Sequence, residues 1–475
     1  MSTRTHSHLS SGSASASPRI KGILSWIIFT TLLALIFLTP IPYGSVEPWW
    51  HAAFEVLVFA LALVWLIDIV RSKIFLTTEQ LWMLAPLFGL ALYAFLQTIP
   101  FTHETTPIGS ISHAISFDPY QTKLFAIGLL ALVLALAMLC RYANSRGKLL
   151  ALAYCVIGIS LVSAVFGIVR QLYQYDQIGF GLPALTRGSG YAQFINKNHF
   201  AFLAEMGLGL LLGLIGGRAV SWSRSLIYFA IALPIWTALI LSNSRGGILA
   251  MAAQIAFLLL ALTLTRKIAL KPSLIEGFGR GPTLALQFIL AVMLIGGIVI
   301  GTIWIGGESL AERLSSARQE IVTQSTDKSH ADRASIWRAT LQLCREHPFT
   351  GVGFGGYWIA ITRYHQGSGE LTPQQAHNDY LELAASGGFI GVALFVWFAI
   401  LVIRRSYQQM KSSDWMRRAL ALGAATGLFG VAVHSLVDFG LHLAGNALVC
   451  IALVAIATQG LEEIRGRRSE IGGQT

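Results

Sequence analysis

Apolar runs long enough to cross a bilayer recur along almost the whole chain. A membrane-spanning helix needs about 20 consecutive apolar residues, since each residue advances the helix by about 1.5 Å. On this criterion the pattern predicts about twelve transmembrane helices. Their approximate ranges are Gly22–Leu38, Trp50–Val70, Leu81–Ile99, Leu124–Cys140, Leu149–Leu172, Phe200–Gly216, Leu226–Leu241, Gly247–Leu264, Leu284–Ile305, Gly387–Ile403, Ala419–Val437 and Leu443–Thr458.

One long polar segment, Gly306–Tyr380, separates the ninth and tenth runs. Segments of this length inside a compact protein usually carry structure or function. A first, amphipathic helix of this segment is expected from apolar residues at helical spacing, namely Leu310, Leu314, Ala317 and Ile321. A second helix is expected over Ala331–Glu346, ending before Pro348. The glycine run Gly351–Gly356 lacks the ending of a phosphate-binding loop and is interpreted as a tight turn.

The fold prediction is an all-α integral membrane protein with a long, partly helical loop between spans 9 and 10. Five parts are expected along the chain: a disordered tail (1–21), spans 1–9 (22–305), the loop (306–380), spans 10–12 (381–459) and a second tail (460–475). On the second loop helix Arg333, Trp337, Leu341 and Cys344 share one face. Arg333 is therefore the loop arginine expected to face inward.

The charges fix an orientation for this arrangement. Only 12% of the residues are charged and 54% are hydrophobic, which excludes a water-soluble enzyme and a disordered chain. With the N-terminus inside, 22 of the 34 Lys and Arg residues fall in cytoplasmic segments, and seven of the other twelve lie in the long loop. The positive-inside rule therefore predicts that both termini are cytoplasmic. The net charge of +11 thus reflects topology, and no nucleic-acid partner is expected.

A candidate base lies where the long loop returns to the membrane, at His377 in the segment His377–Glu382. The imidazole pKa, about 6.5 when unperturbed, suits a general base. Asp379 or Glu382 would orient the ring. The alternative is an interfacial histidine that bonds a backbone carbonyl.

A candidate phosphate ligand is Arg245, in the segment Ser242–Gly247 between spans 7 and 8. A guanidinium binds phosphate oxygens bidentately and stays charged at any relevant pH. Two glycines follow it and let backbones approach one another. The alternative is an arginine that snorkels to the interface.

Polar residues also gather before span 6, at Asn196–His199. They can bind sugar hydroxyls or a phosphate, whereas helix capping by Asn198 is the alternative. Glu205 lies deeper in that span and needs a partner, for which Arg245 is one candidate. His434 and Asp438 share a face of span 11 and are expected to hydrogen-bond between helices rather than line the site. Arg170 is interpreted as a snorkelling or structural residue and not as a ligand.

Five blocks then resemble one family when they are taken in order. They are Asn196–Ala201, Ser244–Gly247, Arg333 with Trp337, His347–Gly353 and His377–Leu381. Together with the predicted spans and loop they resemble the bacterial O-antigen ligase and polysaccharide polymerase superfamily. The motif-bearing resemblance covers about Gly188–Gly391.

The resemblance implies an inverting, metal-independent glycosyltransferase with no cofactor in the bacterial inner membrane, its active site facing the periplasm. The donor would be a glycan on undecaprenyl diphosphate. The acceptor would be a sugar hydroxyl on lipid A core, for a ligase, or on another lipid-linked glycan, for a polymerase. His377 maps onto the base, and Arg245 and Arg333 onto the cations that hold the diphosphate.

Further substrate-binding residues are expected beside these three: Lys197, Asn198, His199, Asn378, Tyr380 and Arg338. Partners other than the two substrates are membrane lipids. Two other classes stay open as alternatives, a transporter of lipid-linked glycans and a noncatalytic component of polysaccharide assembly.

Overall fold

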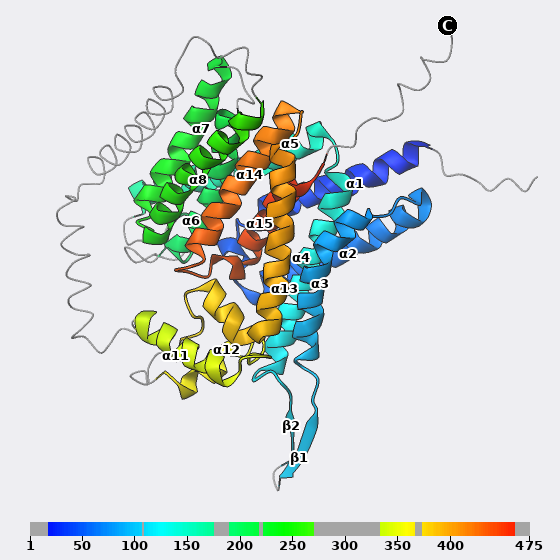
Figure 1. The fold of residues 1–475 in the computed structure, drawn as a ribbon, viewed down its shortest axis with the longest axis vertical. Coiled ribbons are helices and arrows are strands. Elements are labelled where there is room, and N and C mark those ends of the chain that lie inside the picture. Colours follow the sequence, from blue (N-terminus) through cyan, green and yellow to red (C-terminus); the bar gives the residue numbers. More distant parts are fainter. Residues whose placement is uncertain are drawn as a thin grey trace, which may run out of the picture.

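A computed structural model describes residues 18–106, 109–174, 190–217, 222–269, 333–365 and 373–460. Its long helices are α1 (Pro18–Leu38), α2 (Pro48–Ser72), α3 (Thr78–Leu96), α4 (Pro119–Tyr142), α5 (Arg146–Tyr173), α6 (Lys197–Gly216), α7 (Trp222–Leu241), α8 (Arg245–Ala269), α11 (Arg333–Glu346), α13 (Asp379–Met410), α14 (Trp415–His434) and α15 (Ala444–Thr458). Short helical segments are η1 (Tyr43–Ser45), α12 (Tyr357–Ala360), η3 (Ile361–Arg363) and η4 (Gly440–His442). Figure 1 shows the long apolar helices side by side in one bundle, with α11 and α12 at one end of it.

Eleven of the twelve predicted runs coincide with described helices. Eight of those helices are long and apolar enough to cross a membrane, and α1, α7 and α15 contain shorter apolar stretches. These helices confirm a multi-pass membrane protein. The ninth predicted span, Leu284–Ile305, and the amphipathic helix with Leu310 lie outside the described residues, as do most of both predicted tails. The total of twelve spans therefore stays a prediction.

A β-hairpin departs from the all-α prediction, which is wrong in this segment. Strand β1 (Thr102–Thr106) pairs with β2 (Gly109–His113) in antiparallel register, with Thr102 opposite His113. The hairpin projects from the bundle between α3 and α4 (Figure 1). Its residues are mostly polar and show no regular apolar alternation, which is the pattern that predicts a half-buried strand.

Helices α6 and α14 pack backbone against backbone. A Cβ atom added at Gly209 would overlap the backbone of Gly427, and one added at Gly213 would overlap that of Gly423. Each helix thus carries two glycines four residues apart, the spacing that lets membrane helices approach closely. The contact holds the start of α6 beside the end of α14.

The glycine run after α11 is a tight turn, as predicted, and it packs on a kink in α13. Gly351 and Gly353 have positive φ angles of 65° and 89°, and Gly388 at the kink has φ 57°. The backbone N–H of Gly353 donates to the carbonyl of Ser386 at 3.0 Å. This turn fixes the loop helices against the first third of α13.

Helix α11 docks through a different face from the one predicted. Its buried residues are Ile336, Ala339, Thr340 and Leu343. Leu341 is 46% exposed, so its predicted place on the buried face is wrong. The Trp337 indole N–H donates to the carbonyl of Ala376 at 3.0 Å and ties α11 to the residue before His377.

Candidate functional site

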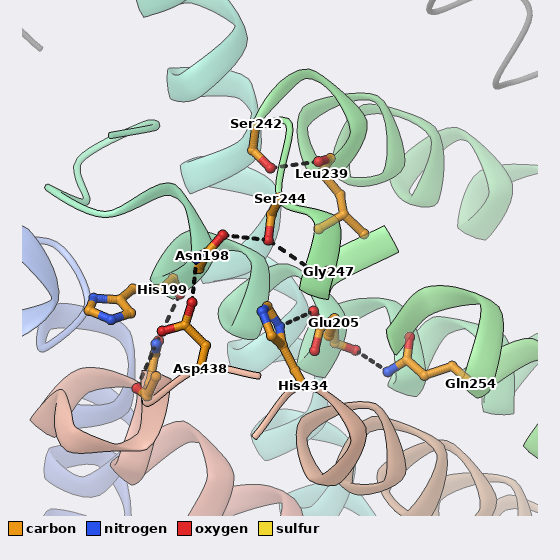
Figure 2. Close-up of polar contacts among 12 residues, drawn as sticks. Asn198, His199, Glu205, Leu239, Ser242, Ser244, Gly247, Gln254, His434 and Asp438 are labelled. Atoms are coloured by element: carbon orange, nitrogen blue, oxygen red, sulfur yellow. Dashed lines mark hydrogen bonds and ion pairs between the residues drawn. The ribbon is translucent and has the colours of Figure 1, made fainter. Parts of the chain in front are cut away.

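The polar residues of the candidate site meet at one end of the bundle, where α6, α8 and α13 begin and α14 ends. We call this the site end. Asp438, in the turn that follows α14, lies at its centre with a side chain only 1% exposed. Its Oδ2 accepts a hydrogen bond from the amide of Asn198 (Figure 2). Its Oδ1 accepts the backbone N–H of Phe439 at 2.9 Å.

Two predicted site residues face the same carboxylate. Nη2 of Arg333 lies 3.7 Å from Oδ2 of Asp438, and Nδ1 of His377 lies 3.9 Å from Oδ1. Arg333 and His377 are themselves 49% and 34% exposed. Burial by itself raises the pKa of Asp438. The opposite effect of His377, the Phe439 N–H and nearby histidines is larger, and it lowers the pKa to about 2. The buried acid is therefore ionised and holds a guanidinium and an imidazole close together.

A hydrogen-bond chain connects Asp438 to the start of α8. Ser244 donates its hydroxyl to Oδ1 of Asn198 at 2.8 Å and accepts the backbone N–H of Gly247 at 3.1 Å (Figure 2). The second bond caps the first turn of α8. Arg245 is the first residue of that helix and is exposed. The chain thus places Arg245 at the site end together with Asp438.

The polar block before span 6 divides into a cap, Asn196, and the first three residues of α6. Asn196, not Asn198, caps α6 by accepting the N–H of Asn198 at 2.9 Å, so the capping alternative for Asn198 is wrong. Lys197, the first residue of α6, is half-buried. His199 is buried, and its ring lies edge-to-face against Phe439 with centroids 5.0 Å apart.

His377 sits in a tightly held turn with a positive φ of 50°. The N–H of Ala376 donates to Oε2 of Glu382 at 2.8 Å, and its carbonyl accepts the Trp337 indole. Asn378 caps α13 by accepting the N–H groups of Tyr380 and Leu381 at 3.1 and 3.0 Å. A positive φ is unfavourable for a residue with a side chain, and it persists where neighbours determine it. These bonds therefore aim the ring of His377.

The acids expected to orient His377 face another histidine, and that expectation is wrong. Nε2 of His442 lies 3.4 Å from Oδ1 of Asp379 and 3.7 Å from Oε1 of Glu382. Loss of solvent lowers the pKa of His442, but Glu382 and Asp379 raise it more, to about 9. Among the described ion pairs, Asp438 is the acid that faces His377.

Three predicted substrate-binding residues make hydrogen bonds to other groups of the protein. Asn378 is buried as the cap of α13, and the Tyr380 hydroxyl donates to the carbonyl of Ala432 at 2.7 Å. Arg338 is exposed on α11, where its Nε donates to the carbonyl of Ala334 at 3.2 Å. As ligands of a substrate they stay predictions.

Next to the site, a glutamate on α6 and a histidine on α14 form a buried ionisable pair. Oε1 of Glu205 and Nδ1 of His434 are 2.7 Å apart, and both side chains are fully buried (Figure 2). The proposed Glu205–Arg245 pair is thus wrong, whereas the interhelical bond predicted for His434 is confirmed. A Cβ atom at Gly246 would overlap the His434 ring, so α8 begins directly against this pair.

Asp438 is the residue that sequence reasoning undervalued. We expected it to make an interhelical hydrogen bond, which it does with Asn198, but it also faces Arg333 and His377. The available signal was an acidic residue near the end of an apolar helix, since such groups need partners. Arg170 is structural, as predicted: it is buried in α5 and donates to the carbonyl of Ala192.

The helices and the polar cluster define a multi-pass membrane protein with a polar site at one end of its bundle. Residues 227–396 match the family model described as O-antigen ligase. This match confirms the resemblance to the O-antigen ligase-related superfamily, whose members are glycosyltransferase-like ligases and polymerases of polysaccharide biosynthesis. A search of curated proteins found no match. The matched range contains Arg245, Arg333 and His377, whereas Asn198 and Asp438 lie outside it.

Proposed function

We propose that the chain transfers a glycan from undecaprenyl diphosphate to a sugar hydroxyl on the periplasmic face of the bacterial inner membrane, with inversion and without a metal. The acceptor lies on lipid A core in a ligase and on another lipid-linked glycan in a polymerase. One observation carries the proposal: the buried carboxylate of Asp438 faces both His377 and Arg333. This arrangement supports the proposal because it brings an imidazole and a guanidinium together at the end of the bundle.

His377 is the proposed general base. Asp438 lies toward its Nδ1, which favours the tautomer with a proton on Nδ1 and leaves Nε2 free to accept one. Nε2 takes the proton of the acceptor hydroxyl as that oxygen bonds to the anomeric carbon. The bond from the anomeric carbon to the diphosphate oxygen breaks, and the diphosphate leaves with the electron pair on the opposite face.

Arg333 and Arg245 are the proposed cations for the departing diphosphate. Guanidinium groups stay charged and match the geometry of phosphate oxygens, so they stabilise the charge that develops on the leaving group. The side chain of Arg333 is about half exposed, and its Nη2 lies 3.7 Å from Asp438, which is too far for a short hydrogen bond. The guanidinium is therefore available to a ligand. Lys197, Asn198, His199, Asn378, Tyr380 and Arg338 complete the proposed substrate contacts.

The test is a transfer assay with purified protein, an undecaprenyl-diphosphate glycan and a lipid-linked or lipid A core acceptor. We expect His377→Ala to lower the rate by about 10²- to 10⁴-fold, the range for loss of a general base. Arg333→Ala and Arg245→Ala should leave no measurable product. The matched control is Arg345→Ala, an exposed arginine on the same helix as Arg333, which should keep wild-type activity.

Each contrary outcome has a definite meaning. Full transfer by His377→Ala would refute the assignment of the base. Movement of the donor across vesicle membranes without product would support a transporter. Absence of product from the wild-type protein with both acceptor types would contradict the enzymatic proposal and favour a noncatalytic assembly component.

A further inference from the structure

The ring of Phe439 is surrounded by three histidines from three different segments. His199, His377 and His442 lie edge-to-face to it, with centroids 5.0, 4.8 and 5.7 Å away. The backbone N–H of Phe439 bonds Asp438, and the side chain is half-buried. An aromatic ring is thus held beside the proposed base and keeps part of its surface in solvent.

The two carboxylate oxygens of Asp438 face different groups and so define two sides of the site. Oδ2 faces Arg333 and Asn198, and Oδ1 faces His377 and the backbone of Phe439. Inversion requires the attacking hydroxyl and the leaving group on opposite faces of the anomeric carbon. With the diphosphate on the arginine side, the acceptor approaches from the side of Phe439.

The charges on the Phe439 side disfavour an anionic ligand. Asp379 and Glu382 both face the single imidazole of His442, so two acids lie against one cation. A phosphate or carboxylate group would have to compete with Asp379 for this one imidazole, which disfavours an anionic ligand. His442 is 40% exposed, and because its Nε2 faces the acids, Nδ1 is the nitrogen left to donate to a ligand. Its pKa of about 9 keeps it protonated at neutral pH.

The geometry points to an acceptor subsite formed by Phe439 and His442, which takes an uncharged sugar ring. The apolar face of the sugar packs against Phe439, since aromatic rings supply apolar contact area at little entropic cost. His442 donates to one hydroxyl, and a neighbouring hydroxyl is presented to His377. This inference rests on the proposed function and assigns its acceptor a class, a pyranose residue without phosphate or carboxylate groups.

The kinetic test compares Phe439→Leu, Phe439→Tyr and His442→Gln in the transfer assay, with donor and acceptor varied separately. We expect Phe439→Leu to raise the acceptor KM roughly tenfold, which corresponds to about 1.4 kcal/mol. The donor KM should stay within about twofold, and Phe439→Tyr should keep the acceptor KM near the wild-type value, because tyrosine retains the aromatic ring. The matched control is Phe389→Leu, because Phe389 is 67% exposed on α13. An unchanged acceptor KM, or a raised donor KM instead, would overturn the subsite.

A binding test separates this inference from the enzymatic proposal. Saturation-transfer NMR measures contact between the purified protein and methyl glycosides of glucose, galactose and mannose, with methyl glucuronide as the anionic comparison. We expect a signal from at least one neutral glycoside, none from the glucuronide, and loss of the signal in Phe439→Leu protein of unchanged melting temperature. No signal from any neutral glycoside, or an equal signal from the glucuronide, would overturn the inference even if transfer is observed. A neutral-sugar signal without any transfer would contradict only the proposed function.

Discussion

Removal of one member of the buried Glu205–His434 pair should destabilise the protein strongly. The two groups are 2.7 Å apart, and both side chains have no exposed surface. Among the described residues, no side chain or backbone group bonds the second carboxylate oxygen or Nε2 of the imidazole. Glu205→Leu therefore leaves His434 without its partner in an apolar interior.

The expected magnitude lies between two limits. Hydrogen bonds between membrane helices contribute on average about 0.6 kcal/mol, whereas loss of one partner of a buried ionic pair costs about 3–5 kcal/mol. Complete burial and the short distance favour the upper range, so we expect a loss of about 3 kcal/mol in the free energy of unfolding. That change is roughly a 150-fold shift in the unfolding equilibrium.

The assay is a double-mutant cycle on protein in mixed micelles, unfolded by titration with SDS and followed by circular dichroism. Glu205→Leu and His434→Leu should each lose about 3 kcal/mol, and the double variant should lose clearly less than the sum, because two apolar side chains leave no unpaired polar group. Additive losses would refute the reasoning. Single losses below about 0.6 kcal/mol would show that the pair contributes no more than an average membrane hydrogen bond.

Three further outcomes follow from the same structure. Gly213→Val should cost about 1–3 kcal/mol in unfolding titrations because its side chain meets the backbone of α14, whereas Gly216→Ala, with neighbours at 3.4 Å or more, should be tolerated. The raised pKa of His442 contributes stability that is complete below about pH 6.5 and is lost as pH rises through about 9. Melting temperatures of the wild type should therefore fall across that window, and those of His442→Gln should stay flatter; parallel curves would contradict this. Asp438→Asn keeps the side-chain shape but removes the charge that faces His377, so kcat should fall by up to about 10²-fold while the donor is still bound; an unchanged kcat would show that the carboxylate does not orient the base.

The helices of the bundle were predictable because composition alone determines them. A run such as Trp50–Val70 has no stable alternative in a membrane, since a helix satisfies all its backbone groups within the segment. The β1–β2 hairpin was not predictable in the same way. Its residues are polar, and without apolar alternation the sequence carries no periodic signal for a strand.

The candidate site was predictable in its chemistry but not in its pairing. His377 and Arg333 were expected as a base and a cation from their residue types and places along the chain. Their common contact with Asp438 depends on how α14 lies against α11 and α13, and the spacing of residues along one helix does not determine that arrangement. The same limit explains the wrong partner for Glu205 and the wrong acids beside His377. It also explains the face of α11, where Leu343 is buried and Leu341 is exposed.

The glycine contact between α6 and α14 has a consequence for how such a protein can change its specificity over evolution. Because backbone atoms meet directly at Gly213 and Gly423, this contact has no side chains that successive substitutions could reshape. A larger residue on one helix would have to push the other away and would move Asn198 and Asp438 apart. We therefore expect new glycan preferences to arise in segments outside this contact, such as α11 and the turn at His377, while the α6–α14 pair stays fixed.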